Sequence, residues 1–443
     1  MKLEDCRPFL SIMKSSILLA FLWLAAAFAC LAQEFETKPE GEYFASFKPL
    51  KAPAPTGLLL KKGDRLAIIG DSITEQKMYS RAMETYLTVC VPDLEITTRQ
   101  YGWGGETAEG FVRRMTNDCL RFAPTIATTC YGMNDHKYRA YDETNGAWYA
   151  SNQLVIVRSF KAAGARMVLG SPGCVGNKVG WAKSGSEAMN LNLCELRNID
   201  IGIAQKEGVA FADVFWPMFT AGYQAQQLYG TNTYAIAGKD GVHPGWSGSF
   251  VMAYAFLKAL GLDGNLGRVE FDLASGKVTA TGGHEVLQTR NGAASIKSSR
   301  YPFCATGELK SDDSIRSAMS LVPFNQELNR FIVVARNGKA AKYRVVWGGV
   351  AKSYTAAELE AGVNIAADFA KNPFSDAFAK VDKAVAAKQD YETRQIKTLF
   401  HGPEGKADME ATVRLTELAR QPLVDAVRAA FVPVTYALEV LPE

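Results

Sequence analysis

Between residues 64 and 261, short apolar runs alternate with longer amphipathic segments. The short runs have the length of buried strands, and the longer ones repeat their apolar residues with the period of a helix that covers a sheet. This pattern predicts strands at 65–69, 94–99, 124–130, 166–169 and 209–214, and helices at 79–89, 107–122, 148–163, 186–207 and 246–260. Strands that alternate with helices form βαβ units, so we expect an α/β fold whose parallel sheet is covered on both faces.

The pattern changes near Leu262. Short alternating runs separated by turn residues extend from about 269 to 350 and predict a β-rich, sandwich-like module. Asn337-Gly338 lies between two of these runs and is typical of a tight hairpin turn. Two long amphipathic helices are expected within about 374–431, and the chain ends in alternating residues typical of a strand. We therefore expect an α/β domain at 63–262 and a β-rich C-terminal module at 263–443, which carries the helical pair as an insertion.

The first residues have the composition of an export signal. Residues 17–31 form an apolar run that is short for a membrane span and has the usual length of a signal-peptide core. Lys14 precedes this run and small residues end it, so we expect a signal peptide at 1–32, with Met1 or Met13 as the start, and a Pro-rich segment at 33–62. The mature protein is then periplasmic or secreted, without stable membrane insertion. A buried core helix and a lipoprotein anchor at Cys30 are the alternatives.

Composition and charge exclude several classes of protein. Of 443 residues, 48% are hydrophobic and 21% charged, which excludes a disordered or fibrous chain. Forty-nine basic and 46 acidic residues give a net charge of +3, without the basic cluster of a nucleic-acid-binding surface. Six cysteines follow the expected signal, too few for a disulfide scaffold, although Cys174 and Cys194 could pair. No clustered His and Cys residues and no phosphate-binding glycine motif are present, so we expect no metal and no cofactor.

Four polar or glycine-rich segments are not needed by a covered sheet. IIGDSITE, YGWGGETAEG and YGMND each follow an expected strand, and KDGVHPGWSG precedes the last helix of the α/β part. Ligands bind outside the carboxyl ends of parallel strands, so we expect these segments to meet in one crevice. Taken one at a time, they are equally typical of a helix cap, a tight turn or an Asn-Asp turn.

The fourth segment contains a candidate base. Asp240 and His243 are three residues apart in one loop, so the carboxylate can reach the ring Nδ1, fix the tautomer and leave Nε2 free to accept a proton. The other histidines have no such partner at a comparable spacing. We expect His136 at the rim of the pocket, and His284 and His401 as surface or packing residues.

Together, and in this order, the segments resemble the four blocks of the SGNH (GDSL-type) hydrolase superfamily. Ser72 stands in GDSIT, Gly105 in GWGGET, Asn134 in GMND, and Asp240 with His243 in DGVHP. The resemblance covers about residues 64–261 and implies a flavodoxin-like α/β/α domain in which Ser72 is the nucleophile, His243 the base and Asp240 its partner. It also implies an oxyanion hole formed by the backbone N–H groups of Ser72 and Gly105 and by the Asn134 amide.

Two parts of the chain follow the family pattern less closely. Gln100-Tyr101 stands where the family often has an Asn before the glycines of its second block, and Gly102 or Gly104 could align in place of Gly105. The β-rich part resembles the C-terminal extensions of exported SGNH proteins from polysaccharide-degrading bacteria, a looser likeness that implies no chemistry of its own.

The resemblance implies a serine ester hydrolase that works through an acyl-enzyme. Export and an appended β module favour the removal of acetyl or other short acyl groups from carbohydrate, with Asp71, Trp103 and His136 as candidate substrate-binding residues. Tyr79 and Trp246 could stack on sugar rings or could pack in the core. A lipase or thioesterase for longer acyl chains and a non-catalytic carbohydrate-binding or cell-surface protein are the alternatives. The expected partner is thus a small or polymeric ester; the oligomeric state is not predicted.

Overall fold

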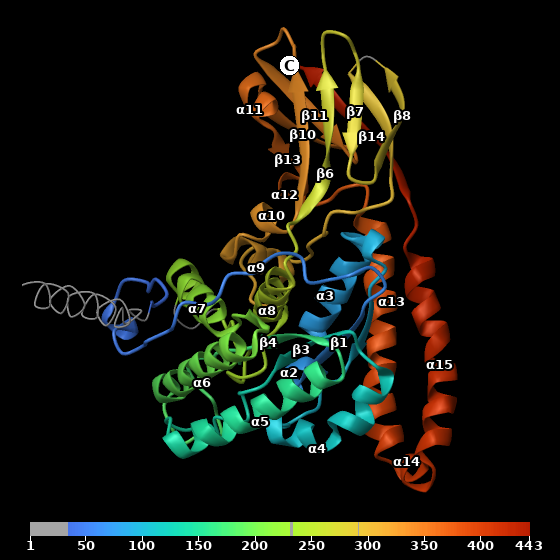
Figure 1. Ribbon diagram of the computed structural model, residues 1–443. Helices are drawn as coiled ribbons and strands as arrows, with labels where there is room; N and C mark the ends of the chain where they lie inside the picture. Colours follow the sequence, from blue (N-terminus) through green and yellow to red (C-terminus); the bar gives the residue numbers. More distant parts are fainter. Residues whose placement is uncertain (1–33, 231–233, 291) are drawn as a thin grey trace, which may run out of the picture.

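A computed structural model describes residues 34–230, 234–290 and 292–443 (Figure 1). The expected signal peptide at 1–32 lies outside these residues. Within the described ranges, no helix combines the length and the apolar character needed to cross a bilayer.

The α/β part contains a five-stranded sheet in which every neighbouring pair is parallel. The strand order is β2-β1-β3-β4-β5, so β2 and β5 are the two edges. The strands are β1 (Arg65–Gly70), β2 (Thr97–Gln100), β3 (Ile126–Cys130), β4 (Arg166–Gly170) and β5 (Ala210–Ala212). All five expected strands are present, and their ends differ from the expected ones by at most three residues.

Helices cover both faces of this sheet, since side chains along β1 point alternately to the two faces and are buried on each. Leu66 and Ile68 belong to one buried cluster with α3 and α8, whereas Ala67 and Ile69 belong to another with α4 and α5. The three-layer α/β/α fold is therefore confirmed. The helices are α2 (Ser72–Glu75), α3 (Met78–Val89), α4 (Ala108–Asp118), α5 (Glu143–Ala162), α6 (Ser186–Glu207), α7 (Phe215–Tyr229) and α8 (Trp246–Ala259), with short helices η1 (Glu42–Phe44), η2 (Pro92–Leu94) and η3 (Leu120–Phe122).

The Pro-rich segment before β1 is packed onto the α/β part. Phe44 and Phe47 are fully buried. Their rings contact α7, with Phe47 4.9 Å from Phe219 between ring centroids. Arg197 of α6 donates to the carbonyl of Leu50 at 2.7 Å. The sequence did not predict α7, whose aromatic residues and Pro217 obscure the period of its apolar face.

The C-terminal part forms a second lobe of two sheets (Figure 1). One sheet has the order β13-β10-β6-β7, and the other β12-β11-β14-β9-β8. Trp347 of β11 is fully buried, 5.8 Å from the ring of Phe331 in the other sheet. The strands are β6 (Asn265–Asp272), β7 (Val278–Thr281), β8 (His284–Arg290), β9 (Ala293–Ser298), β10 (Arg330–Arg336), β11 (Lys342–Trp347), β12 (Val350–Thr355), β13 (Val363–Asn364) and β14 (Val434–Pro442), with short helices α9 (Ile315–Leu321), α10 (Phe324–Glu327), α11 (Ala356–Ala361) and α12 (Ile365–Asp368). The expected sandwich-like arrangement is therefore present.

The hairpin expected at Asn337-Gly338 is wrong. The strands on either side of this turn, β10 and β11, lie in different sheets: β10 pairs with β6 and β13, and β11 pairs with β12 and β14. Because both edges of each strand are already occupied, the turn carries the chain from one sheet to the other. Asn337 nevertheless has the positive φ, 61°, that makes this residue type common in turns.

The expected helical pair leaves the β-rich lobe and lies along the α/β part (Figure 1). It consists of α13 (Ser375–Arg394), a π-helical turn η4 (Gln395–Phe400), α14 (Pro403–Ala407) and α15 (Met409–Ala430). Strand β2 is the edge of the parallel sheet that faces it. The backbone N–H of Gln100 donates to Glu392 at 3.1 Å, and the carbonyl of Thr98 accepts from Lys388 and Arg420, each at 2.9 Å. Side chains of the helical pair thus take the place of a neighbouring strand.

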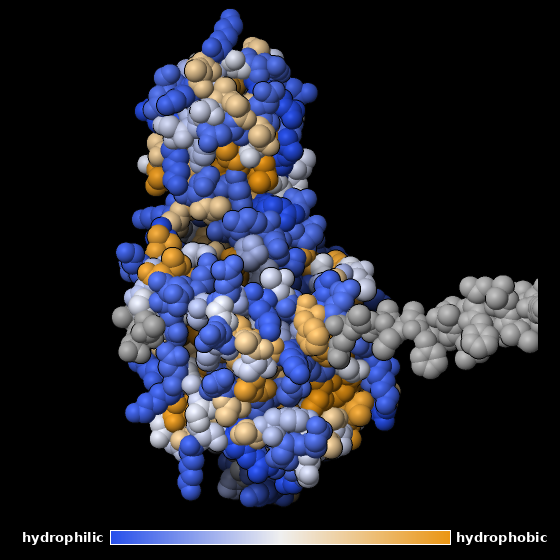
Figure 2. Space-filling model, turned by 90° about the vertical axis from the view of Figure 1, so that its left-hand side faces the viewer, coloured by the Kyte–Doolittle hydropathy of each residue, from blue (hydrophilic) through white to orange (hydrophobic). Residues whose placement is uncertain are grey.

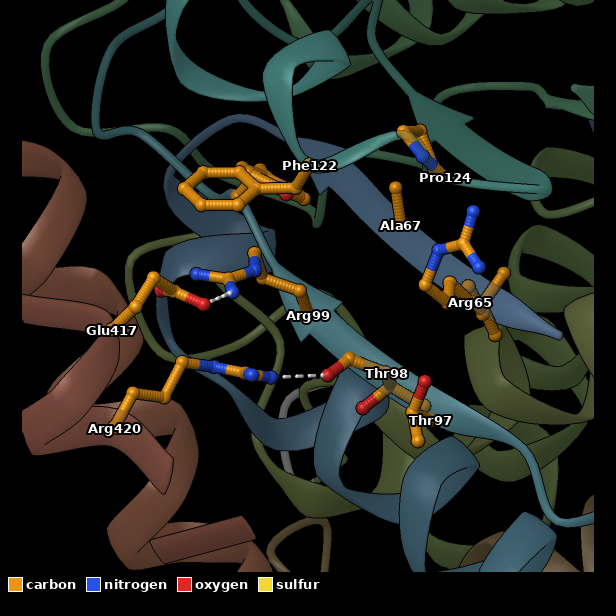
Figure 3. A pocket seen from close by; sticks show the side chains of 11 residues that line it. Arg65, Ala67, Thr97, Thr98, Arg99, Phe122, Pro124, Glu417 and Arg420 are labelled. Carbon is orange, nitrogen blue, oxygen red and sulfur yellow. Dashed lines mark hydrogen bonds and ion pairs between the residues drawn. The ribbon is translucent and has the colours of Figure 1, made fainter. Parts of the chain in front are cut away.

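Buried charges hold this interface together. The ammonium group of Lys388 is almost completely buried and lies 3.1 Å from Glu84 of α3 and 2.8 Å from Glu392. Arg99 and Glu417 form a second pair, at 2.7 Å. Arg99 and Glu417 border a hollow of about 200 Å³ between β2 and α15 (Figure 3). The view in Figure 2 shows a mainly hydrophilic surface, with hydrophobic side chains scattered over both lobes.

All six cysteines among the described residues are buried free thiols. The pairing considered for Cys174 and Cys194 is therefore not formed in this structure. Cys130 ends the buried strand β3, as expected for a core residue.

Candidate active site

Ser72 lies where the first strand of the sheet meets its first helix. β1 ends at Gly70, and Ser72 is the first residue of α2. Asp71 caps this helix, since its carboxylate accepts from the N–H of Ile73 at 2.9 Å. A Cβ at Gly70 would clash with the side chain of Thr74, so only glycine permits this sharp turn. The turn places the Ser72 hydroxyl at the carboxyl end of the sheet, partly exposed.

Three of the predicted residues form a continuous hydrogen-bonded chain. Ser72 Oγ lies 2.8 Å from His243 Nε2, and His243 Nδ1 lies 2.6 Å from Asp240 Oδ2. A carboxylate can only accept, so Nδ1 carries the proton and Nε2 is left to accept from the serine hydroxyl. The arrangement can therefore remove a proton from Ser72 and stabilise the resulting imidazolium.

The loop between α7 and α8 fixes the acid and the base together. Asp240 Oδ1 accepts from the backbone N–H groups of Val242 and His243, each at 2.9 Å. Partial burial acts to raise the pKa of Asp240, but the hydrogen bonds from the His243 backbone and ring and from the Val242 N–H outweigh it and hold this pKa below its ordinary value. Gly238, with φ +82°, lets the loop close, because a Cβ there would meet the His243 carbonyl.

The second segment forms a loop of glycines against α2. A Cβ at Gly102 would clash with the backbone of Thr74 and Glu75. The N–H of Gly104 donates to the Glu75 carboxylate. Gly105 is exposed, has φ +72°, and its N–H finds no acceptor among the described residues. Gly105 is thus the exposed glycine whose N–H is left to bind a ligand, since Gly104 donates to Glu75 and Gly102 is buried.

The Asn134 side chain is oriented by a buried ion pair. Its Nδ2 donates to the carbonyl of Glu106 at 3.0 Å, which leaves its second N–H for another acceptor. Glu106 is fixed in turn by Arg114, through two contacts of 2.6 Å, and by the hydroxyl of Tyr131 at 2.7 Å. Tyr138 donates to the Asn134 Oδ1 at 3.2 Å. Every polar group of this amide except one N–H therefore has a partner.

Two buried aspartates support the loops and do not line the pocket. Asp71 is 2% exposed, and burial raises its pKa to about 8, with further increments from Asp135 and Glu106. Asp135 accepts from the N–H groups of Ala108 and Gly132, and burial raises its pKa to about 6 despite these bonds. The expectation that Asp71 binds substrate is therefore corrected: its carboxyl is inside the protein, where it caps α2.

The expected position of His136 at the pocket rim is corrected, and of the two alternatives for Tyr79 the structure shows packing in the core. His136 is fully buried, with its Nδ1 on the Met133 carbonyl, and burial lowers its pKa to about 4. It is a core residue rather than part of a pocket rim. Tyr79 is fully buried and stacks on Phe256 with 5.6 Å between ring centroids, so it cannot stack on a sugar.

The tryptophans near the motifs are partly exposed. The ring of Trp103 has Arg114 and Lys397 at 5.0 and 5.3 Å from its centroid, and His401 at 5.0 Å. This packing joins the glycine loop to the C-terminal helices. A role of Trp103 in substrate binding stays a prediction, as does that of Trp246, whose ring lies 5.4 Å from Arg81.

The remaining histidines pack as expected. His284 is buried against Phe331 and bonded to the Leu266 carbonyl at 2.8 Å. His401 lies 2.7 Å from the buried carboxylate of Asp118.

Sequence reasoning missed the residues that support the site. Glu75 and Glu106 stand inside the quoted motifs, and an acidic residue among glycines in GWGGET is a signal that could have been used. From the sequence, Asp135 is interpreted only as part of an Asn-Asp turn. No local pattern points to Lys397, because its partner Glu75 lies 322 residues earlier in the sequence.

An open hollow of about 380 Å³ lies beside the base. Asp240 and His243 line it together with Met78, Pro244, Asp312 and Asp313, among others. Asp312 and Asp313 come from the C-terminal part; each has one carboxylate oxygen on a backbone N–H, that of Ala235 at 3.0 Å and of Trp246 at 3.2 Å. The volume suits a small ligand, and the walls combine charged side chains, Lys239 among them, with apolar surface.

Comparisons with known proteins agree with the α/β fold and with an ester hydrolase domain. Residues 68–249 match the GDSL-like Lipase/Acylhydrolase family. No curated protein sequence matches the chain.

Among solved structures, a gut microbial diltiazem-metabolizing enzyme, BT4096, is similar with a TM-score of 0.72 and 20% identity, over 88% of this chain and 100% of that chain. The acetylxylan esterase Axe2 from Geobacillus stearothermophilus has a TM-score of 0.38 and 20% identity, over 46% of this chain and 97% of that chain. LAE5, an alpha/beta hydrolase enzyme from the metagenome of Lake Arreo, Spain, has a TM-score of 0.38 and 21% identity, over 46% and 98%. At such identities the first likeness shows the fold alone, and it extends over both lobes.

Proposed function

The chain carries a domain of the GDSL-like lipase/acylhydrolase family and is a serine carboxylic ester hydrolase, and on that premise we propose that it removes acetyl or other short acyl groups from a polar alcohol through Ser72, His243 and Asp240. The observation that carries the proposal is the chain of two short hydrogen bonds, 2.8 and 2.6 Å, that joins the three side chains.

The proposed reaction proceeds through an acyl-enzyme. Ser72 Oγ attacks the ester carbon while its proton passes to His243 Nε2, and the ester C=O becomes a tetrahedral oxyanion. The intermediate collapses by breaking the bond to the alcohol oxygen, which takes the proton from His243. Water then attacks the acylated serine with His243 again as base, releasing the carboxylic acid and the free hydroxyl of Ser72. Asp240 stays ionised throughout, as its lowered pKa favours, and stabilises the imidazolium.

We place the oxyanion among three donors. As the first residue of α2, Ser72 has a backbone N–H with no partner within the helix. The N–H of Gly105 has no protein acceptor among the described residues, and Asn134 has one N–H to spare. Each donor of this kind is worth about 3–4 kcal/mol of transition-state stabilisation, by analogy with single deletions in other hydrolases.

The hollow beside His243 favours a polar alcohol. The leaving alcohol takes its proton from His243, so it occupies the side of Ser72 on which the base lies. This side is lined by Asp312 and Asp313, whose carboxylates can accept hydrogen bonds from hydroxyl groups, and by Lys239, whose ammonium group can donate to them. A sugar hydroxyl fits these walls, and we propose acylated carbohydrate as the substrate class.

We further propose that residues 1–32 direct export and are removed, which gives the enzyme access to polymeric esters. The N-terminal sequence of the protein recovered outside the cytoplasm tests this point. A mature chain that begins near residue 33 would agree with the proposal, whereas retention of Met1 or Met13 in that fraction would contradict it.

Hydrolysis of p-nitrophenyl esters from acetate to long chains, measured beside Ser72→Ala, tests the activity. We expect Ser72-dependent turnover that falls steeply beyond short acyl groups, followed by deacetylation of acetylated glycans. A preference for long chains would instead indicate a lipase or thioesterase. Equal turnover by Ser72→Ala and the wild-type protein would contradict the mechanism.

A further inference from the structure

Glu75 connects the nucleophile's helix with the glycine loop. It lies on the same turn of α2 as Ser72, three residues further along. One carboxylate oxygen accepts from the N–H of Gly104, the residue directly before the proposed oxyanion donor Gly105. The backbone of Glu75 also lies so close to Gly102 that no side chain fits between them. The loop is therefore fastened to α2 at two points on either side of Trp103.

The other oxygen of Glu75 is held by the C-terminal helical pair. Lys397 Nζ lies 2.6 Å from Glu75 Oε1. Both side chains are about three-quarters buried, with 30% and 25% of their surfaces exposed. The same ammonium group lies 5.3 Å from the centroid of the Trp103 ring. Lys397 thus contacts both the carboxylate and the loop that the carboxylate holds.

Lys397 stands in an irregular part of its helix. α13 does not continue regularly past Arg394 but passes into the π-helical turn η4, whose residues 395–400 include Lys397. Such turns widen a helix, cost stability and are frequent at functional sites. Here the turn is the part of the helical pair that reaches the glycine loop, since His401, directly after it, contacts Trp103 at 5.0 Å.

From this geometry we infer that Lys397 is a positioning residue for ester hydrolysis: it fixes the Glu75 carboxylate, which holds Gly104 and so aims the N–H of Gly105 at the oxyanion. The inference rests on the proposed function. It assigns the C-terminal part a place in the reaction, reached through the loop and without contact to the substrate.

The physical reason is the sensitivity of an oxyanion hole to direction. The N–H of Gly105 belongs to the peptide unit that begins at the carbonyl of Gly104, and two glycines in succession allow that unit many orientations. A bond to Gly104 restricts them, but the carboxylate of Glu75 has to be held as well, because it is partly exposed and can turn towards water. Lys397 removes that freedom before the substrate arrives.

The test uses Lys397→Met and Lys397→Arg in the full-length protein, with p-nitrophenyl acetate as the substrate. We expect Lys397→Met to lower kcat by roughly tenfold to a hundredfold with little change in KM, because a misdirected donor weakens binding of the transition state and not of the ester. Lys397→Arg keeps the charge and is expected to restore most of kcat. In a Glu75→Gln background, Lys397→Met is expected to have a smaller effect, since the neutral amide can accept from Gly104 without a counter-ion.

Glu410→Gln is the matched control. Glu410 pairs with Arg121 at 3.1 Å and likewise joins α15 to the α/β part, but it does not contact the glycine loop. We expect it to leave kcat unchanged at an equal Tm. A wild-type kcat in Lys397→Met would overturn the positioning role, and so would an equal loss of kcat in Lys397→Met, Lys397→Arg and Glu410→Gln. In either case, Ser72-dependent turnover by the wild-type protein would still support the proposed function. Absence of Ser72-dependent turnover in the wild-type protein would overturn both.

Discussion

Asp240 holds His243 by two bonds, one to each N–H that the histidine can offer it. Oδ1 accepts from the backbone N–H at 2.9 Å and Oδ2 from the ring Nδ1 at 2.6 Å. The imidazole is therefore fixed in position by the same group that selects its tautomer.

This arrangement predicts the effect of Asp240→Asn. The amide can keep the bond to the backbone N–H, but its NH₂ group would donate to Nδ1 and move the ring proton to Nε2, where it can no longer accept from Ser72. We expect kcat to fall by about 10⁴-fold, the cost of the equivalent change in a serine protease, with the Tm nearly unchanged. Steady-state kinetics and thermal unfolding check this, and an Asp240→Asn variant with wild-type kcat would show that the bond has no catalytic role.

Asn134→Ala removes the only side-chain donor proposed for the oxyanion. The expected result is a fall in kcat of about 10²–10³-fold with little change in KM, because the oxyanion exists only after attack. Tyr138→Phe, which removes the donor to the Asn134 Oδ1, serves as the milder comparison. A rise in KM at constant kcat in Asn134→Ala would place the amide in ground-state binding instead.

Asp71→Asn should make stability less dependent on pH. A carboxyl whose pKa is about 8 in the folded protein and ordinary in the unfolded chain binds its proton more tightly when folded, so stability falls as pH rises from near 4 to about 8. Asparagine can cap Ile73 in the same way without a proton to lose. We therefore expect the Tm of Asp71→Asn minus that of the wild-type protein to increase from about pH 5 to about pH 8.

A constant difference in Tm across that pH range would contradict this account. Asp135 and Glu106 are present in both proteins, so their own titration does not produce the expected trend, although each raises the pKa of Asp71.

Lys388→Met should destabilise the protein strongly. Its ammonium group compensates Glu84 and Glu392, which are 4% and 0% exposed, and also binds the Thr98 carbonyl. Breaking a buried pair of this kind costs about 3–5 kcal/mol, because the remaining charge is left without compensation. Chemical unfolding measures the effect, and Lys380→Met, at an exposed position of the same helix, provides the control. Equal midpoints for the two variants would refute the importance of this network.

Most of the α/β part could be predicted because its signals are local. Buried parallel strands such as β3 are short apolar runs, and α6 begins and ends within its expected bounds at Ser186 and Glu207. The hydrogen bond between Ser72 and His243 agrees with a general property of parallel sheets, the meeting of their strand ends at one crevice.

The errors have a different physical origin. Asp71 and His136 look like site residues because they stand in or next to the matched motifs. In the structure, however, the Asp71 carboxyl points inward and caps α2, and the His136 ring is buried on the Met133 carbonyl. The prediction of a hairpin at Asn337 is wrong because turn residues indicate a change of chain direction but not which sheet the next strand joins. No local pattern in the sequence shows that residues of α13 and α15 bind β2. A variant truncated after Asp263 would therefore lose these partners of β2 as well as the β-rich lobe.

The covering of β2 also has a consequence for biosynthesis. The side chains that bind its free edge follow it in the sequence by 290 to 322 residues. During synthesis β2 therefore precedes the residues that cover its edge by tens of seconds, at usual rates of about 5–20 residues per second. During that interval two nascent chains can pair edge to edge. We expect the yield of this protein to depend on chaperones that keep nascent chains apart, more than on the stability of the finished fold.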